Sequence, residues 1–79
     1  MSPTILRYGK YRFFFNSREE QRRHVHVSTA DGTVKIWIEP LVAIAESYNL
    51  SSGELAELLK IVEEHKNEFI TEWNLHFGI

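Results

Sequence analysis

The residue periodicity of this chain changes once, and this change limits the folds that the chain can adopt. Up to residue 39 the apolar residues are mostly β-branched or aromatic and lie in short runs, whereas after residue 52 they recur at helical spacing. Strand-type segments followed by helical segments are typical of an α+β domain. We therefore expect one domain over residues 1–79, with an antiparallel sheet that precedes the long helix.

Two turn signals divide the strand region into two hairpins. Gly9-Lys10 suits a tight turn with glycine first, and Asp31-Gly32 is a strong signal for another. The predicted strands are residues 4–8, 11–16, 23–29 and 33–39. The sequence thus predicts a four-stranded antiparallel sheet.

Two helices are predicted to pack on one face of this sheet. Pro40 suits the first turn of a short helix over about 40–48. Ser51 and Glu54 match the capping-box pattern at the start of a long helix over about 52–77. At 1.5 Å per residue that helix is about 39 Å long, whereas four strands make a sheet only about 15–20 Å wide.

The long helix is therefore expected to extend past the sheet and to offer its end to another chain. A domain of this size buries only about 60% of its unfolded surface, so association of copies would supplement its core. We expect a homo-oligomer for this reason. The candidate interface residues are Lys66, Phe69, Trp73 and Phe77.

Charge and composition exclude several classes of protein. Residues 1–38 carry seven Lys or Arg and three acidic residues, whereas residues 39–79 carry two and eight, which suggests an anionic partner for the first half. The chain contains no cysteine, and no apolar run approaches the roughly 20 residues that span a bilayer. We expect a soluble cytoplasmic protein with no membrane contact and no cofactor.

The second hairpin places two histidines on one face of the sheet. With Asp31-Gly32 as the turn, His26 lies opposite Trp37 and His24 lies opposite Glu39, while Lys35 lies opposite Ser28. The helices then cover the other face, which holds Val25, Val27, Val34, Ile36 and Ile38. The histidines are expected to point away from the helices.

The first hairpin adds positive charge and an aromatic ring to the histidine face. Its turn sets Arg7 opposite Arg12. The residues that alternate with these two are larger and more hydrophobic, so they are assigned to the core. Sheets that bind single-stranded RNA combine positive charge with stacking planes. The candidate anion-binding or nucleic-acid-binding residues are Arg7, Arg12, Phe14, Arg22, Arg23 and Trp37.

Several segments together carry a resemblance to a known family. They are PTIL (3–6), YRFFFNS (11–17), HVHV (24–27), DGTVKIWIEP (31–40) and ELAELLKIVEEHKNEFITEWNLHFG (54–78). With them the chain resembles, nearly end to end, the small bacterial proteins classed as domain of unknown function 4160. The resemblance implies a partner protein encoded in the same two-gene module, similar to a toxin–antitoxin pair. Members usually place prolines before the first histidine, where this chain has Arg22 and Arg23.

Three hypotheses for the chemistry of the histidine face remain open. The leading one is a surface that binds a partner protein, because Trp and Arg dominate binding hot spots. The second is metal-independent ribonuclease activity, with His24 and His26 as general base and acid and Lys35 stabilising the transition state. The third is a metal site of His24, His26 and Glu39. A closed tetrahedral site has four ligands, so this one would need one further ligand.

Overall fold

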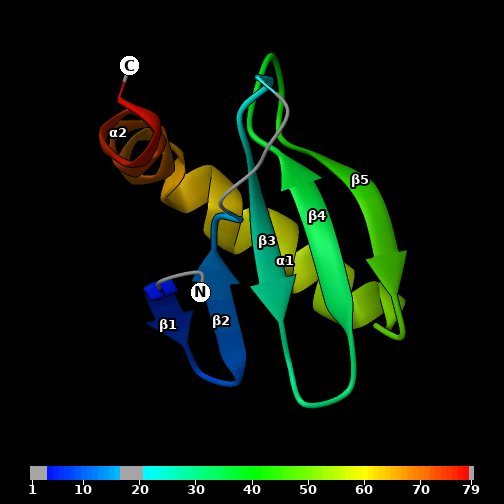
Figure 1. Cartoon of the computed structure of the whole chain (residues 1–79). Coiled ribbons are helices and arrows are strands. Elements are labelled where there is room, and N and C mark those ends of the chain that lie inside the picture. The colour runs from blue at the N-terminus through cyan, green and yellow to red at the C-terminus, as the bar shows by residue number, and fades with distance from the viewer. Residues whose placement is uncertain (1–3, 17–20, 79) are drawn as a thin grey trace.

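The computed structural model describes residues 4–16 and 21–78 as a five-stranded antiparallel sheet and two helices, an α+β arrangement (Figure 1). The strands lie in the order of the chain, from β1 to β5. Their bounds are β1 Thr4–Tyr8, β2 Tyr11–Phe14, β3 His24–Ser28, β4 Thr33–Trp37 and β5 Ala43–Tyr48. The helices are α1 Ser52–Glu64 and α2 Lys66–Phe77.

The fifth strand corrects the expected helix over residues 40–48. Residues 43–48 instead form β5, which pairs antiparallel with β4 on both sides of a bulge at Ala45. Ile44 is half-buried between exposed Ala43 and Ala45, so the segment alternates with the period of a strand. A helix of two turns is only marginally stable in water, whereas hydrogen bonding to β4 satisfies the backbone of this segment.

The turn between β3 and β4 differs from the predicted one and shifts the register. Thr29 N donates to Gly32 O at 2.9 Å, and Thr29 Oγ1 accepts from Asp31 N at 3.1 Å and Gly32 N at 3.0 Å. The predicted two-residue turn is therefore wrong, and the connection comprises residues 29–32. Asp and Thr side chains commonly form such local turns.

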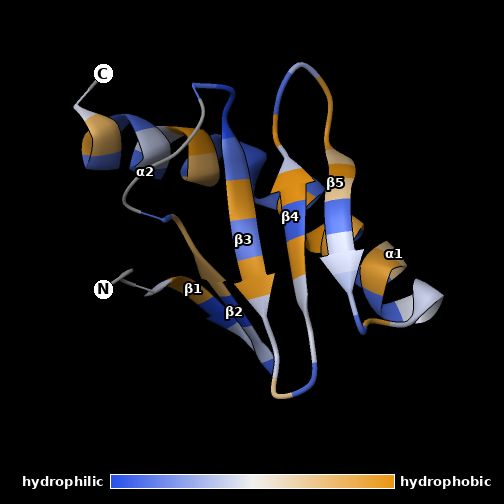
Figure 2. Cartoon of the chain, turned by 45° about the vertical axis from the view of Figure 1, so that its right-hand side comes forward, coloured by the Kyte–Doolittle hydropathy of each residue, from blue (hydrophilic) through white to orange (hydrophobic). Residues whose placement is uncertain are grey.

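The register consequently moves by two residues from the predicted one. His24 lies opposite Trp37 and His26 opposite Lys35, rather than Glu39 and Trp37. A shift of two residues leaves every side chain on its expected face, because side chains alternate with period two. Figure 2 shows this alternation of hydrophobic and hydrophilic residues along β3 and β4.

The first hairpin has the predicted register near its turn. Arg7 lies opposite Arg12 and Tyr8 opposite Tyr11. Further from the turn a bulge leaves Ile5 without a partner, so Thr4 rather than Ile5 faces Phe14. Tyr11 and Phe13 alternate with Arg12 on β2 and are buried in the core, as predicted from their hydrophobic side chains.

The core lies between the sheet and the helices. The strands contribute buried aromatic and branched side chains, and both helices contribute to the same cluster. Its buried members are Tyr11, Phe13, Phe15, Val25, Val27, Val34, Ile36, Ile38, Leu58, Ile61, Val62, Phe69 and Trp73. Figure 1 shows α1 passing behind the sheet and α2 near the end where β3 begins.

The single long helix predicted over 52–77 is wrong, because the helix is interrupted at His65. α1 ends there with φ −106° and ψ 15°, and α2 begins at the next residue. After the interruption Phe69 packs on Phe13, with ring centroids 5.5 Å apart, and Trp73 packs on Phe15 at 5.3 Å. The free energy of burying these two aromatic side chains favours the bent path over a straight helix.

The predicted overhang of the helix is therefore also wrong. Phe69 is 1% exposed and Trp73 is 2% exposed, so neither offers a surface to another chain. Phe77 is half-buried and lies against Trp73, with ring centroids 4.3 Å apart, and Lys66 is half-buried. These residues therefore give no support to an oligomer.

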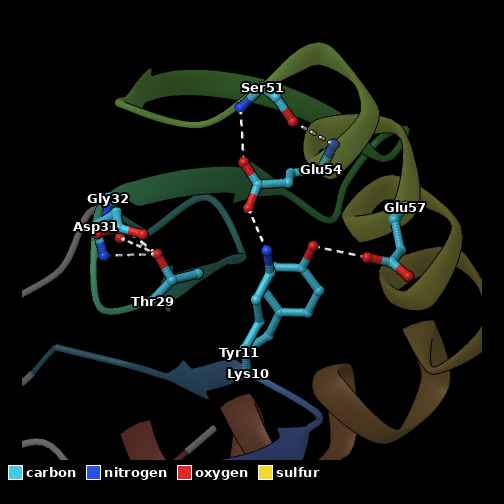
Figure 3. Close-up of polar contacts among 8 residues, drawn as sticks. All are labelled: Lys10, Tyr11, Thr29, Asp31, Gly32, Ser51, Glu54 and Glu57. Atoms are coloured by element: carbon cyan, nitrogen blue, oxygen red, sulfur yellow. Dashed lines mark hydrogen bonds and ion pairs between the residues drawn. The ribbon is translucent and has the colours of Figure 1, made fainter.

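Polar contacts attach the first hairpin to α1, as Figure 3 shows. The capping box of Ser51 and Glu54 forms as predicted, and Glu54 also accepts from Lys10 Nζ at 2.6 Å. The hydrogen bond from Lys10 and that from the Ser51 backbone lower the pKa of Glu54 to about 2. Tyr11 OH donates to Glu57 Oε1 at 2.6 Å, and burial together with this bond raises the pKa of Tyr11 to about 12.

Gly32 allows the end of β5 to approach the β3–β4 turn. A Cβ atom at this position would collide with the carbonyl oxygens of Tyr48 and Asn49. Asn49 adopts a positive φ of 56°, which asparagine tolerates better than most residues, and its Nδ2 donates to Asp31 O at 2.7 Å. Within the part of the chain that the structure describes, no helix is long and apolar enough to cross a membrane.

Candidate functional site

The face of the sheet opposite the core holds the predicted site residues. Residues that lie directly opposite in an antiparallel pair share a face. The pairs Arg7–Arg12, Phe14–His26, His26–Lys35, His24–Trp37 and Lys35–Glu46 therefore belong to one surface, which we call the open face. It consists of Thr4, Arg7, Arg12, Phe14, His24, His26, Ser28, Thr33, Lys35, Trp37, Ala43, Glu46 and Tyr48.

Trp37 lies between two cations on this face. The guanidinium carbon of Arg22 lies 4.1 Å from the centroid of its ring system, and Lys35 Nζ lies 4.5 Å from it. Arg22 Nε also donates to the backbone oxygen of Glu39 at 2.7 Å, which holds the guanidinium in place. Each cation over an indole contributes about 0.5–1 kcal/mol where it is exposed. The Trp37 side chain is thus pre-oriented, and its surroundings are positively charged.

Phe14 forms a second combination of ring and cation. Arg12 lies over it at 4.6 Å, and the His26 ring stacks on it with centroids 5.5 Å apart and an interplanar angle of 23°. Arg12 Nε also donates to Thr4 Oγ1 at 2.6 Å, and Arg7 lies opposite Arg12 on β1. Arg7 and Arg12 thus lie opposite one another as predicted, and the Arg12 guanidinium is held by Phe14 and Thr4.

The two histidines occupy different environments. His24 is fully buried, and its ring lies 5.4 Å from Trp37, 5.0 Å from Trp73 and 5.1 Å from His26. His24 Nδ1 lies 2.7 Å from the backbone oxygen of Arg22, so this nitrogen carries a proton and donates. The ring is held by packing and by this bond.

His26 is half-buried and faces the open side. Its Nε2 lies 3.2 Å from Asn16 Nδ2, so the two side chains are within hydrogen-bonding distance. Of the two histidines, His26 is the one that a ligand on the open face can reach.

Arg23, just before β3, contacts both the segment that follows β4 and the helix α2. Its Nη1 donates to Glu39 Oε1 at 3.1 Å, and its Nη2 and Nε donate to Asn74 Oδ1 at 2.7 and 3.1 Å. Partial burial acts to raise the pKa of Glu39, but the hydrogen bonds from Arg23 outweigh it and lower that pKa. Arg23 therefore holds α2, and with it Trp73, against the end of the sheet.

Glu39 is consequently not the neighbour of His24 that the sequence predicted. Its carboxylate is bound by Arg23, and Trp37 lies opposite His24. Among residues 4–16 and 21–78, no three His, Asp or Glu side chains gather closely enough to hold a metal ion. The arrangement therefore gives no support to the site of His24, His26 and Glu39.

A pocket of about 380 Å³ lies on the open face between β2 and β5. Its polar and aromatic lining includes Phe14, Asn16, His26, Lys35, Glu46 and Tyr48. The sequence reasoning missed Glu46 and Tyr48, because it placed them in a helix. The alternation of Val42 and Ile44 with small alanines was the signal that could have placed them on a strand.

A comparison with protein families identifies the chain. The model of the family described as domain of unknown function (DUF4160) matches residues 10–74. The chain belongs to this family. Neither the curated proteins nor the solved structures include a match. The matched range contains β2 to β5, α1 and most of α2, so nearly all of the open face lies within the DUF4160 domain.

Membership bears on the positions that the structure brings together. Arg12, Phe14, His26, Lys35 and Trp37 all lie inside the matched range, whereas Arg7 lies before it. Both combinations of ring and cation therefore lie within the matched range.

Proposed function

We propose that this protein is a binding module, the protein-binding component of a two-gene module similar to a toxin–antitoxin pair, and that its open face receives the partner. The observation that carries the proposal is Trp37, fixed between Arg22 and Lys35 on a face that α1 leaves uncovered (Figure 1). Trp and Arg are the residue types that contribute most to binding hot spots.

The arrangement of the open face favours a partner that presents carboxylates. Arg12, Arg22 and Lys35 bring three cations to β2, the β3 entrance and β4, while Glu46 is the acid on the neighbouring strand. Complementary charge guides association and excludes unsuitable partners. The rings beneath these cations supply apolar area that a partner can cover.

Binding fits the histidine geometry better than catalysis does. A pair of general base and acid needs both rings within hydrogen-bonding reach of the reacting group. His24 is fully buried, and the centroids of its ring and the His26 ring lie 5.1 Å apart in an edge-to-face arrangement. This spacing leaves no room for a phosphate between the two rings. Metal-independent ribonuclease activity with Lys35 remains an alternative prediction, and it would require His24 to become accessible.

RNA is a second candidate ligand for the same face. The observation that favours it is the layered arrangement of Arg12, Phe14 and His26, since cationic and aromatic side chains together bind single strands. RNA would use phosphate contacts from the cations and stacking on exposed parts of the rings.

The test of the main proposal is co-purification with the product of the adjacent gene. We expect Trp37→Ala to weaken the complex at least tenfold, because it removes the ring that both cations contact. Leu75→Ala is the matched control, since Leu75 is 73% exposed on α2, away from this face. Absence of a complex, or equal weakening by both variants, would contradict the proposal. The absorbance ratio at 260 and 280 nm of the purified native protein separates a protein partner from RNA.

A further inference from the structure

β5 is the last strand of the sheet, and its outer edge is unpaired within the described part of the chain. Five of its six residues are exposed, and Ile44 is half-buried. Figure 1 shows α1 passing behind the sheet and α2 on the side of the sheet away from β5. An edge of this kind presents backbone N–H and C=O groups with which another strand can pair.

The sequence of β5 lacks most of the features that prevent such pairing. Ala43–Tyr48 contains no lysine, arginine or proline, and its one charged residue, Glu46, lies opposite Lys35 of β4. Ala45 has no partner on β4, so one bulge interrupts the middle of the strand. β1, at the other edge, is shorter and carries Arg7, which makes it the less suitable edge.

Two large apolar side chains lie exposed at opposite ends of this edge. Leu41, two residues before β5, is 73% exposed, and Tyr48, the last residue of β5, is 72% exposed. Isolated exposed apolar residues are common, but here the pair flanks an unpaired strand. In an antiparallel pair the beginning of one strand lies beside the end of the other.

We propose that β5 pairs antiparallel with β5 of a second copy of this chain, which joins two five-stranded sheets into one continuous sheet. A two-fold axis through the middle of β5 places Leu41 of each copy beside Tyr48 of the other, so the apolar contact forms twice. Each copy of β5 thus offers at one end the apolar side chain that the other end of its partner contacts. This favours a second copy over an unrelated strand. The small side chains of Ala43, Ala45 and Ser47 allow the strands to approach.

This dimer also supplies the supplement that a small domain requires. A domain of this size leaves a large share of its surface unburied, and association is one route to additional buried area. The surface differs from the one expected from the sequence, because Phe69 and Trp73 are already buried within the chain. The dimer does not depend on the proposed function, since its test uses the isolated protein.

The first experiment is sedimentation velocity over a series of protein concentrations. We expect a dimer of the unchanged protein, and we expect Leu41→Lys and Tyr48→Glu each to raise its dissociation constant at least tenfold. The double variant places opposite charges at both contacts and should recover most of the loss, as a double-mutant cycle measures. Leu75→Lys is the control, because Leu75 is as exposed as Leu41 but lies on α2.

Three results would overturn this inference. The first is a monomer at all protein concentrations up to about 100 μM. The second is an equal rise of the dimer dissociation constant in Leu75→Lys. The third is a double variant that dimerises more weakly than either single variant. The recovery in the double variant depends on antiparallel pairing of β5, so a dimer through another surface would not show it.

The second experiment uses the absence of cysteine from the chain. Ala45→Cys introduces one thiol beside the proposed two-fold axis, where the two copies of this residue come close enough for a disulfide. We expect this variant to form a covalent dimer under mild oxidation, and Leu75→Cys to remain largely monomeric. Equal cross-linking in both variants would indicate random collision and would contradict the proposal. Trp37→Ala should leave the cross-link unchanged, which separates this result from the test of partner binding.

Discussion

His24 of β3 packs against Trp73 of α2, with ring centroids 5.0 Å apart and an interplanar angle of 61°. The contact joins the first residue of a strand to a helix that follows it by about 40 residues in the chain. Trp73 Nε1 finds no hydrogen-bond partner among the described residues, so packing dominates the contact. The register places both histidines of the H-x-H pair on the open face, but α2 covers His24, contrary to the expectation that both point away from the helices.

The two histidines are expected to differ in their effect on stability. His24→Ala should lower the free energy of unfolding by about 2–4 kcal/mol, because it opens a cavity beside Trp73 and Trp37. His26→Ala should cost less than about 1 kcal/mol, because that ring is half-buried. Urea unfolding of both variants measures the difference, and equal losses would show that His24 is not held as the structure places it.

RNA cleavage provides a separate test of the ribonuclease alternative. If His26 transferred a proton, His26→Ala would lower cleavage by orders of magnitude and leave RNA affinity nearly unchanged. We expect the unchanged protein not to cleave RNA, because His24 is buried. Incubation with labelled single-stranded RNA in the presence of a chelator measures this. Cleavage that disappears in His26→Ala would restore the catalytic hypothesis.

RNA binding, if it occurs, should depend on salt through Arg12. Arg12→Ala removes one cation beside Phe14 and should reduce the slope of log affinity against log salt by about one unit. Lys60→Ala, an exposed residue of α1, is the matched control. Fluorescence anisotropy at several salt concentrations measures both. No retention of RNA at about 50 mM salt, where charge attraction is strong, would remove this candidate.

Two glycine substitutions should have opposite effects. Gly32→Ala places a Cβ against the backbone of Tyr48 and Asn49 and should cost about 1–3 kcal/mol. Gly53→Ala lies in the first turn of α1, with its nearest neighbour at 3.9 Å, and should stabilise the protein by about 0.5–1 kcal/mol. Thermal unfolding of both variants measures these shifts. A neutral Gly32→Ala would mean that β5 does not approach the β3–β4 turn this closely.

The contact between Lys10 and Glu54 should make stability depend on acidic pH. The pKa of Glu54 is lowered from 4.5 to about 2, so its contribution to stability is present above pH 4.5 and is lost as the pH falls toward 2. Glu54→Gln should therefore flatten the dependence of the melting temperature on pH in this range. Glu63→Gln, at an exposed position of the same helix, is the control. A slope unchanged by Glu54→Gln would contradict the assignment.

Local patterns in the sequence were sufficient for several features of the fold and of the site. The alternation of Val25 and Val27 with His24 and His26 assigned the faces of β3, because side chains on a strand alternate with period two. The capping box of Ser51 and Glu54 located the start of α1, since it involves residues only three apart. Both signals arise within a few residues of chain and do not require the rest of the fold.

Tertiary structure decided the features that depend on distant residues. Residues 43–48 form a strand because the edge of β4 is available, and no pattern within so short a segment excludes a helix. The interruption at His65 and the burial of His24 follow from the packing of Phe69 and Trp73 on the end of the sheet. Hydrophobic burial is non-directional, so the sequence identified which side chains are apolar, and only the folded chain determined which surfaces cover them.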